Sequence, residues 1–276
     1  MTRQSRLHAL FAALFVAALV AGGPARSGEP PYVPLPGEIG KDVIWLPSED
    51  VVVRRMLDVA QLTVKDFLVD LGSGDGRTVI AAARRGAQAL GVEHNPQLVE
   101  YSQRMAQKAR VGARAQFVQG DLFEADLSQA TVITLFLLEE INLKLRPKLL
   151  GLRPGTRIVS NSFDMSEWVA DGMATVSVGE GCTSYCDVYL WIVPVKVGGT
   201  WRLGTGELTI EQRFQMITGT LTANGKATPV KGRVTGDQVS FKAGDAEYQG
   251  RVGADGIMGT VKARNRTGEW RATRGG

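Results

Sequence analysis

A glycine-rich turn flanked by acidic residues is the part of this chain whose residue types and spacing could do chemistry. Residues 69–77 read Val-Asp-Leu-Gly-Ser-Gly-Asp-Gly-Arg, which places glycines at positions 72, 74 and 76. Such a turn between a strand and a helix lets backbone N–H groups approach a ligand closely at the positive end of the helix. It lacks Gly-Lys-Ser/Thr, which excludes a P-loop, and its G-x-G-x-G spacing differs from the dinucleotide fingerprint G-x-G-x-x-G. The alternative is a tight turn that binds nothing.

A second acidic residue stands at the distance from this turn where a ribose-binding acid is expected. Glu93 follows the apolar stretch 87–92 and lies about twenty residues beyond the glycine turn. A carboxylate at this place can accept hydrogen bonds from both ribose hydroxyls. We therefore expect Glu93 to bind a nucleoside and His94 to border it, with a solvated glutamate at a strand end as the alternative.

The run Asp-x-Gly-x-Gly-x-Gly, from Asp70 to Gly76, resembles motif I of the class I S-adenosylmethionine (SAM) methyltransferases. SAM carries a sulfonium and an ammonium group and no phosphate, which suits carboxylates beside the turn. In that class an acid after the third strand commonly contacts the adenine amine; Asp121 stands there, with a turn cap as its alternative role. The resemblance thus implies a set of cofactor contacts: Ser48, Asp70, Gly72, Ser73, Gly74, Asp75, Gly76, Glu93, His94, Asp121 and Leu122.

Further runs narrow the resemblance to the FAM173-type methyltransferases, whose characterised eukaryotic members methylate lysines on mitochondrial inner-membrane proteins. The most specific of them is Asn-Leu-Lys-Leu-Arg-Pro, residues 142–147. The resemblance implies a SAM-dependent protein-lysine methyltransferase with a protein substrate, membrane-associated proteins being among the candidates. The family's Pro-Thr-Pro is Pro47-Ser48-Glu49 here, which keeps the hydroxyl. The matching runs are residues 41–48, 69–77, 91–96, 120–123, 135–147 and 189–194.

Strand and helix patterns alternate in a way that brings these residues to one edge of a sheet. We expect an α/β fold: a Rossmann-like, doubly wound class I methyltransferase sheet with a terminal antiparallel hairpin, 174–178 with 187–193. Ligands bind beyond the carboxyl ends of such strands. The other expected strands are 67–71, 87–92, 115–119, 130–138 and 156–160; the expected helices are 50–62, with Ser48 as N-cap, 78–85, 96–110 and 142–153.

The methyl acceptor is expected at the same edge. Methyl transfer is an in-line displacement whose leaving group needs no acid, so placement supplies most of the rate. A lysine acceptor must be neutral when it attacks, and no residue is assigned as its general base. The best-placed acceptor contacts are the carbonyls of Phe136, Leu137 and Leu138 and the side chain of Asn161.

From Val197 the chain becomes rich in Gly and Thr and shows alternating strands, so residues 197–276 are expected to form a small all-β meander, as a barrel or a curved sheet. Gly-x-Trp near both ends (199–201 and 268–270) suggests that the ends pair. No catalytic constellation stands out there, and a binding module and a packing domain are both open. The expected division is a signal peptide (1–27), a linker (28–40), a methyltransferase domain (41–196) and this β domain.

Composition limits the remaining classes. The formal charge of +4 comes largely from the first 27 residues, and no basic run of five occurs, so nucleic acid is not an expected partner. With two histidines and two cysteines, no metal site is expected. Two other functions stay open: an NAD(P)-binding oxidoreductase on a similar sheet, and a non-catalytic SAM-binding protein that binds a partner. The oligomeric state is also open.

The first residues predict export. Arg3 and Arg6 precede an apolar stretch, 9–20, that is short for a bilayer span, and Ala25-Arg26-Ser27 offers small residues for cleavage. A periplasmic location follows, with an uncleaved membrane anchor or a cytoplasmic protein as alternatives. In an exported protein Cys182 and Cys186 can form a disulfide; two free thiols are the other possibility.

Overall fold

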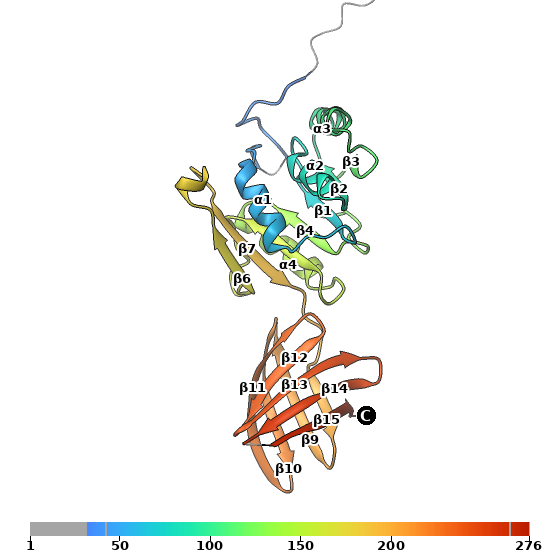
Figure 1. The fold of residues 1–276 in the computed structure, drawn as a ribbon, viewed down its shortest axis with the longest axis vertical. Coiled ribbons are helices and arrows are strands. Elements are labelled where there is room, and N and C mark those ends of the chain that lie inside the picture. The colour runs from blue at the N-terminus through green and yellow to red at the C-terminus, as the bar shows by residue number, and fades with distance from the viewer. Residues whose placement is uncertain (1–31, 42, 265, 276) are drawn as a thin grey trace, which may run out of the picture. The chain divides into compact units, whose positions relative to one another are not determined.

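The structure is a computed structural model that describes residues 32–41, 43–264 and 266–275 (Figure 1). The expected signal peptide, residues 1–27, lies outside the described residues, as does the expected linker up to residue 31. Among the helices that are described, none is long and apolar enough to cross a membrane.

Within the described residues, seven strands form a sheet in the order β3-β2-β1-β4-β5-β7-β6. The first five of these pair in parallel, and β7 runs antiparallel to both β5 and β6. The expected doubly wound sheet with a terminal antiparallel hairpin is confirmed. The strands are β1 (Phe67–Leu71), β2 (Gln88–Glu93), β3 (Ala115–Gln119), β4 (Val132–Leu135), β5 (Arg157–Asn161), β6 (Gly172–Thr175) and β7 (Asp187–Ile192).

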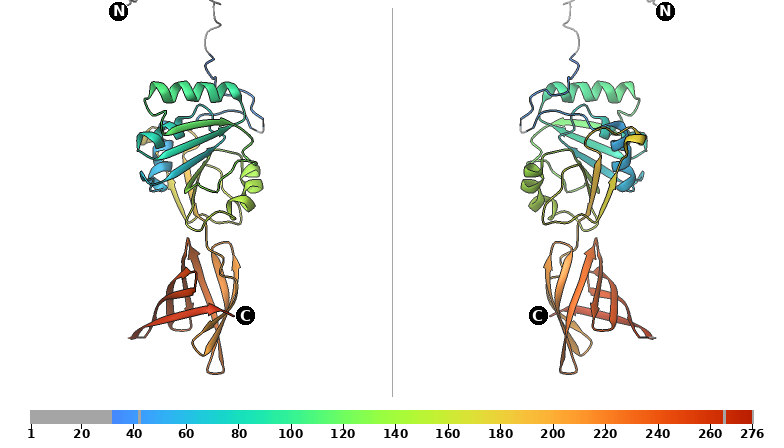
Figure 2. Two further views of the ribbon diagram at one scale, coloured as in Figure 1. Left: turned by 90° about the vertical axis from the view of Figure 1, so that its right-hand side faces the viewer. Right: turned by 90° about the vertical axis from the view of Figure 1, so that its left-hand side faces the viewer.

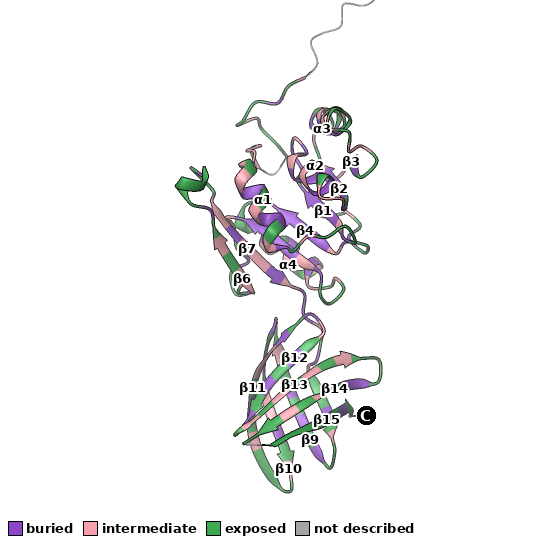
Figure 3. Ribbon diagram, in the orientation of Figure 1, coloured by how far each residue is buried: buried purple, intermediate pink, exposed green. Residues whose placement is uncertain are grey.

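Helices cover both faces of the sheet, so its central strands are buried (Figure 3). Apolar residues of α1, α2 and α3 share one core with one face, and those of α4 share a second core with the other. Figure 2 shows α1 and α4 on opposite sides of the sheet. Each helix buries one apolar stripe, as an amphipathic pattern predicts. The helices are α1 (Asp50–Val59), α2 (Arg77–Arg84), α3 (Pro96–Lys108) and α4 (Glu139–Leu149).

Several boundaries differ from the sequence prediction. Ser48 is not the N-cap of α1; Glu49 occupies that place, and its side chain makes no capping hydrogen bond. The strand expected over 130–138 is only β4, because the chain leaves the sheet after Leu135 and turns into α4 at Glu139, three residues earlier than expected. Two glutamates in the first turn of α4 favour that start, since they complement the helix dipole.

The hairpin strand expected over 174–178 is β6, which ends at Thr175. Beyond it lies a short 3₁₀ helix, η1 (Val178–Glu180). The Ser177 side chain and the Glu180 carboxylate form a capping box that starts this helix and keeps Val178, which is 79% exposed, out of the sheet.

The C-terminal residues form only strands, as predicted, and of the two expected forms, a barrel and a curved sheet, the structure has a closed barrel. Consecutive strands pair antiparallel, and β15 closes the barrel by pairing with β8, for example Ala272 opposite Leu203. The sequence analysis missed β8 as a strand, although it expected the two ends to pair. Closure pairs the backbone N–H and C=O groups that an open sheet would leave unpaired along its two edge strands. The strands are β8 (Gly199–Leu203), β9 (Gly206–Arg213), β10 (Met216–Ala223), β11 (Lys226–Thr235), β12 (Gln238–Ala243), β13 (Ala246–Gly253), β14 (Gly256–Ala263) and β15 (Arg266–Arg274).

Aromatic side chains fill the barrel. Phe241 stacks on Tyr248 with ring centroids 4.6 Å apart, and Trp270 meets Phe241 edge-on at 5.6 Å. Trp201 is also buried, and its indole N–H donates to the Val197 carbonyl at 2.7 Å. Alternate residues of each strand point inward, so side chains fill the interior of the barrel, as in other small barrels.

The turn between β9 and β10 contacts the segment before β6. Phe214 stacks on Trp168 with ring centroids 6.2 Å apart, and the Gln215 amide donates to the Val169 carbonyl at 2.5 Å. From β11, Arg233 pairs with Asp171, whose other carboxylate oxygen accepts the Ile192 N–H at 2.7 Å. These contacts give the barrel a packing role. The domain division at 196/197 stays a prediction.

Replacing Arg233 by alanine should destabilise the protein, because it removes the partner of a carboxylate that is only 6% exposed. We expect a loss of about 1–3 kcal/mol in the free energy of unfolding, measured by urea denaturation. The matched control is Arg251→Ala, whose ion pair with Asp237 leaves the two side chains 65% and 42% exposed. That change should cost about 0–1 kcal/mol. Equal losses in the two variants would contradict a stabilising role for the Arg233–Asp171 pair.

Candidate functional site

A cleft opens beyond the carboxyl ends of β1, β2 and β4, where the strand order reverses. It encloses about 1020 Å³, including space open to solvent. This is the place where open α/β sheets bind their ligands. The lining comes from the segment 39–48, the glycine turn after β1, and the segments that follow β2, β3 and β4.

The glycine turn has a backbone that side chains would not tolerate. Gly72, Gly74 and Gly76 have φ angles of 73°, 54° and 79°, in the left-handed region that favours glycine. A Cβ atom on Gly74 would lie 2.3 Å from Nε1 of Trp45, which lines the cleft. A Cβ on Gly76 would lie 2.7 Å from the ring of Phe117. Gly76 thus serves the packing of α2 on the sheet, and it is the one residue of the predicted cofactor set that does not line the cleft.

Glu93 holds the glycine turn in place. One carboxylate oxygen accepts the Gly74 N–H at 2.9 Å, and the other accepts the Asn95 N–H at 2.9 Å. The side chain is half-buried and faces the cleft. Each oxygen retains a lone pair, so the carboxylate can still accept hydrogen bonds from a ligand. His94 also lines the cleft and is exposed.

Asp70 is a buried acid at the floor of the cleft. Thr134, on the neighbouring strand β4, donates a hydrogen bond of 2.6 Å to its carboxylate. Burial raises the pKa of Asp70 to about 7, the Thr134 hydrogen bond lowers it, and the nearby Asp75 and Glu93 carboxylates raise it further. Asp70 therefore carries a partial charge near neutral pH, and a cation in the cleft would favour its ionised form.

The cations around the cleft are paired with acids. Arg77 binds the Asp75 carboxylate, with Nη2 at 2.6 Å and Nε at 3.0 Å, and also donates to the Ser48 carbonyl at 2.7 Å. Lys41 donates to Asp121 at 2.6 Å. That ammonium lowers the pKa of Asp121. Lys41 and Arg77 are thus paired with Asp121 and Asp75, and neither of them pairs with Asp70 or Glu93. Because these two acids face the cleft without a cationic partner from Lys41 or Arg77, the cleft favours a positively charged ligand.

Asp121 takes the turn-capping role that was the alternative to an adenine contact, because its second oxygen accepts the Phe123 N–H at 2.8 Å. Asp121 and Leu122 nonetheless line the cleft. A contact with a base stays a prediction for both residues.

The four predicted acceptor contacts divide into two pairs. Phe136 and Leu137 line the cleft, whereas Leu138 and Asn161 do not. Leu138 is 45% exposed, and Asn161 is fully buried. The Asn161 amide donates to the Ser48 hydroxyl at 2.9 Å, and its oxygen accepts the Ser162 hydroxyl at 3.0 Å. Asn161 thus fixes Ser48 at the wall of the cleft, and a direct contact with the acceptor stays a prediction.

Known proteins resemble this chain over its first part. Residues 70–172 match the family model of the ANTKMT methyltransferase domain. A protein-lysine N-methyltransferase from Saccharolobus islandicus is 40% identical over 154 residues, which are 55% of this chain and 94% of that protein. The chain therefore belongs to the methyltransferase family of this Saccharolobus islandicus protein. The adenine nucleotide translocase lysine N-methyltransferase from Mus musculus is 36% identical over 116 residues, which are 41% of this chain and 49% of that enzyme.

A solved structure agrees with this assignment. The RNA methyltransferase from Salinibacter ruber, in complex with S-adenosyl-L-homocysteine, is 47% identical, with a TM-score of 0.51. The match covers 55% of this chain and 96% of that one. Our protein is therefore a SAM-dependent methyltransferase, and the oxidoreductase and non-catalytic alternatives are set aside.

The residues of the methyltransferase fit its cofactor. The unpaired acids of the cleft, Asp70 and Glu93, suit the sulfonium and ammonium groups and the ribose hydroxyls of SAM, whereas a pyrophosphate would meet like charge. The glycine turn gives close backbone approach, and the buried Ser73 hydroxyl within it has no hydrogen-bond partner among the described residues. Glu93 would hold the ribose, and the segment with Trp45 would cover the cofactor.

Two groups of the methyltransferase were missed by the sequence analysis. Trp45 lies in one of the family-like runs, residues 41–48, and its place in that run was the signal available. Phe163 and Tyr185 form a cluster with Phe136 at the acceptor edge. Only the fold brings those three segments together, so no local pattern could have found them.

Replacing Glu93 by alanine should weaken SAM binding about ten- to a hundred-fold. The change removes the ribose acceptor and also the partner of the Gly74 N–H, and one charge-assisted hydrogen bond contributes about 1.5–3 kcal/mol. Isothermal titration calorimetry measures the affinity. Glu100→Ala, on the exposed side of α3, is the control and should bind SAM normally. Wild-type affinity in a folded Glu93→Ala variant would remove Glu93 from the cofactor site.

Proposed function

We propose that this methyltransferase transfers the methyl group of SAM to lysine side chains of proteins. The observation that carries the proposal is the 40% identity to a protein-lysine N-methyltransferase over 94% of that protein. The charges at the acceptor edge support it. Glu139 and Glu140 are exposed and directly follow the loop Phe136–Leu138. A lysine substrate is cationic, and acidic side chains attract it.

An RNA substrate is the second candidate, because the similar Salinibacter ruber protein is an RNA methyltransferase. RNA binding relies on lysine and arginine contacts to phosphates. At this cleft the two cations, Lys41 and Arg77, are each engaged by a carboxylate. Glu139 and Glu140, in the first turn of α4, would repel a phosphate backbone at that end of the helix. These charges favour the protein substrate over RNA.

The residues supply placement and apolar surroundings for the reaction. SAM, when bound, supplies an electrophilic methyl group on its sulfonium. Trp45 and Leu137 line the cleft, each against the glycine turn, and give it apolar walls there. The Asn161–Ser48 hydrogen bond keeps the wall beside it rigid. A lysine ammonium must lose its proton before it attacks, and burial against apolar side chains lowers the pKa of an amine.

The class of substrate can be tested with labelled SAM. Purified protein is incubated with SAM carrying a radioactive methyl group and a lysate of the source cells, and the products are treated with protease or with nuclease. We expect the macromolecular label to be released by protease and to resist nuclease, and Glu93→Ala to reduce it at sub-saturating SAM. Label that nuclease releases and protease leaves intact would establish RNA as the substrate and overturn the proposal.

We further propose that the protein is exported. The disulfide between Cys182 and Cys186 supports this, because disulfides persist in oxidising compartments. The basic start and apolar stretch of residues 1–27 support it too. N-terminal sequencing of the protein from its native host should find a terminus near Gly28. An intact terminus at Met1 or Thr2 in the soluble cytosolic fraction would overturn the proposal.

A further inference from the structure

Three aromatic rings meet at the acceptor edge of the cleft, each from a different segment. Phe136 follows β4, Phe163 follows β5, and Tyr185 lies on the loop before β7. The centroid of Phe136 is 5.3 Å from that of Tyr185 and 6.3 Å from that of Phe163, and Phe163 and Tyr185 are 6.0 Å apart. Phe136 also lines the cleft, so this aromatic cluster begins where the cofactor site ends.

The cluster is not part of the buried core. Tyr185 is 44% exposed, and Phe136 and Phe163 are half-buried. Tyr185 meets Phe136 edge-on, at an interplanar angle of 66°, so these two rings do not cover each other face to face, and the exposed part of Tyr185 is open to a ligand. Ring faces carry negative electrostatic potential and attract cations. An open cluster of three rings is therefore suited to the stem and ammonium of a lysine side chain.

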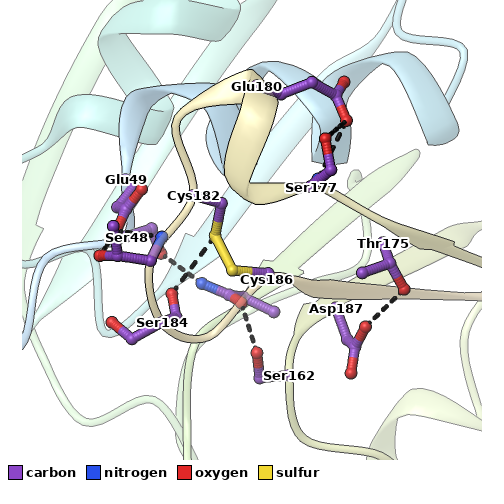
Figure 4. The surroundings of a disulfide bond; sticks show 12 residues. Ser48, Glu49, Ser162, Thr175, Ser177, Glu180, Cys182, Ser184, Cys186 and Asp187 are labelled. Carbon is purple, nitrogen blue, oxygen red and sulfur yellow. Dashed lines mark hydrogen bonds between the residues drawn. A yellow bond between two sulfur atoms is a disulfide. The ribbon is translucent and has the colours of Figure 1, made fainter.

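A disulfide bond and hydrogen bonds to the N-cap residue of α1 fix the loop that carries Tyr185. The Cys182–Cys186 disulfide closes this loop (Figure 4). Tyr185 lies between the two cysteines in the sequence and has a φ of 56°. Thr183 donates to the Glu49 carboxylate from its backbone N–H at 3.1 Å and from its hydroxyl at 2.7 Å. Glu49 is the N-cap of α1 and follows Ser48, which lines the cleft.

Figure 4 shows Ser48 and Glu49 beside the disulfide, with the hydroxyl of Ser162 nearby. Ser162 donates to Asn161, which in turn donates to Ser48. The loop of Tyr185 and the end of β5 that precedes Phe163 are therefore held against two adjacent residues, Glu49 and Ser48. Such a fixed position is what a specificity residue requires, because a mobile ring would lose its entropy on binding.

We propose that Tyr185, with Phe136 and Phe163, forms the binding site for the acceptor lysine side chain, and that the disulfide and Glu49 are the groups that position Tyr185. The proposal rests on the proposed lysine specificity and adds the residues that recognise the side chain. Glu139 and Glu140, exposed just beyond Phe136, supply the acidic surroundings that a cation favours.

Binding of a model side chain tests the site without requiring methyl transfer. The probe is Nα-acetyl-lysine methylamide, its neutral counterpart is Nα-acetyl-norleucine methylamide, and saturation-transfer NMR measures their affinities for the full chain loaded with S-adenosyl-L-homocysteine. We expect the lysine probe to bind about five- to ten-fold tighter than the norleucine probe. Equal affinities, or no lysine binding at tens of millimolar, would overturn the proposal.

Variants assign that binding to Tyr185. Tyr185→Ala should weaken the lysine probe about five- to ten-fold, whereas Tyr185→Phe, which keeps the ring, should retain it. Val178→Ala, an exposed residue of η1 without a ring, is the control. Affinity for S-adenosyl-L-homocysteine and the melting temperature should stay unchanged in all three, which a merely structural role would not allow. Wild-type probe binding by Tyr185→Ala would overturn the assignment.

The positioning role of the disulfide has its own readout. Dithiothreitol should lower the affinity of the wild-type protein for the lysine probe about three-fold. It should not lower the affinity of Tyr185→Ala any further. The double variant Cys182→Ser with Cys186→Ser, or Glu49→Ala, which removes the acceptor of both Thr183 hydrogen bonds, should reproduce the effect of reduction. If reduction weakens Tyr185→Ala as much as the wild type, the disulfide does not act through Tyr185. If the lysine probe binds but no methyl group is transferred to lysine, the proposed function is wrong. If methyl transfer to lysine occurs but the probe does not bind at Tyr185, this binding site is wrong.

Discussion

Replacing Gly74 by valine should abolish SAM binding, with a loss of at least about a hundred-fold in affinity. The residue has a φ of 54°, which costs a side chain with a Cβ about 1–2 kcal/mol, and more when it is β-branched. The new Cβ would also stand 2.3 Å from Trp45 Nε1, so the indole must move from the cleft wall. Displacing the turn then breaks the Gly74 N–H hydrogen bond to Glu93.

Gly112→Val is the matched control for this change. Gly112 has no positive φ, and a Cβ there would lie 3.9 Å from its nearest neighbour, the Gln107 side chain, which is ordinary contact. Calorimetric titration with SAM should find normal affinity in this control and none measurable in Gly74→Val. A folded Gly74→Val protein that binds SAM normally would show that the glycine turn does not approach the cofactor.

Replacing Asp70 by asparagine should change how the stability of the protein without SAM depends on pH. Burial raises the pKa of Asp70 from 3.8 to about 7. The unfolded chain therefore ionises at lower pH than the folded one. The contribution of Asp70 to stability is fully present below pH 3.8 and is lost as the pH rises through about 7. About three pKa units correspond to roughly 4 kcal/mol in total.

Asparagine keeps the shape and can still accept the Thr134 hydrogen bond, but it does not ionise. The unfolding free energy of Asp70→Asn relative to wild type should therefore increase by about 2–3 kcal/mol between pH 5 and pH 8. Urea denaturation at both pH values measures this difference. Asp255→Asn, at an exposed turn of the barrel, should show no such change. An Asp70→Asn difference that is the same at both pH values would contradict a charge penalty at this site.

The grouping of the predicted cofactor residues at one cleft could be predicted from the sequence because its signals are local. The glycines after β1 and the acid at the end of β2 depend on strands that each read clearly from their apolar residues. Parallel pairing then brings Gly72, Glu93 and Asp121 to one edge without further information. Helix α4 was placed three residues late because the apolar run through Leu138 masks the end of β4.

The acceptor half could not be predicted in the same way. Tyr185 meets Phe136 from a loop that a disulfide and the hydrogen bonds from Thr183 to Glu49 hold in place. The disulfide was one of two possibilities for the cysteines, and the contact with Glu49 has no signal in the sequence. The barrel was one of the two expected forms, but its strand β8 was missed. The β8 segment is short, and it becomes a strand through its pairing with β15, about seventy residues later.

The central claim is that the methyl group ends on a lysine. The most direct measurement starts from the lysate proteins that the enzyme has labelled with radioactive SAM. These proteins are hydrolysed, and their amino acids are separated by chromatography beside mono-, di- and trimethyllysine standards. The account predicts that the label elutes with one or more of the methyllysines and that Gly74→Val yields none of it. Label that elutes with methylarginine, methylhistidine or a methylated nucleoside would contradict it.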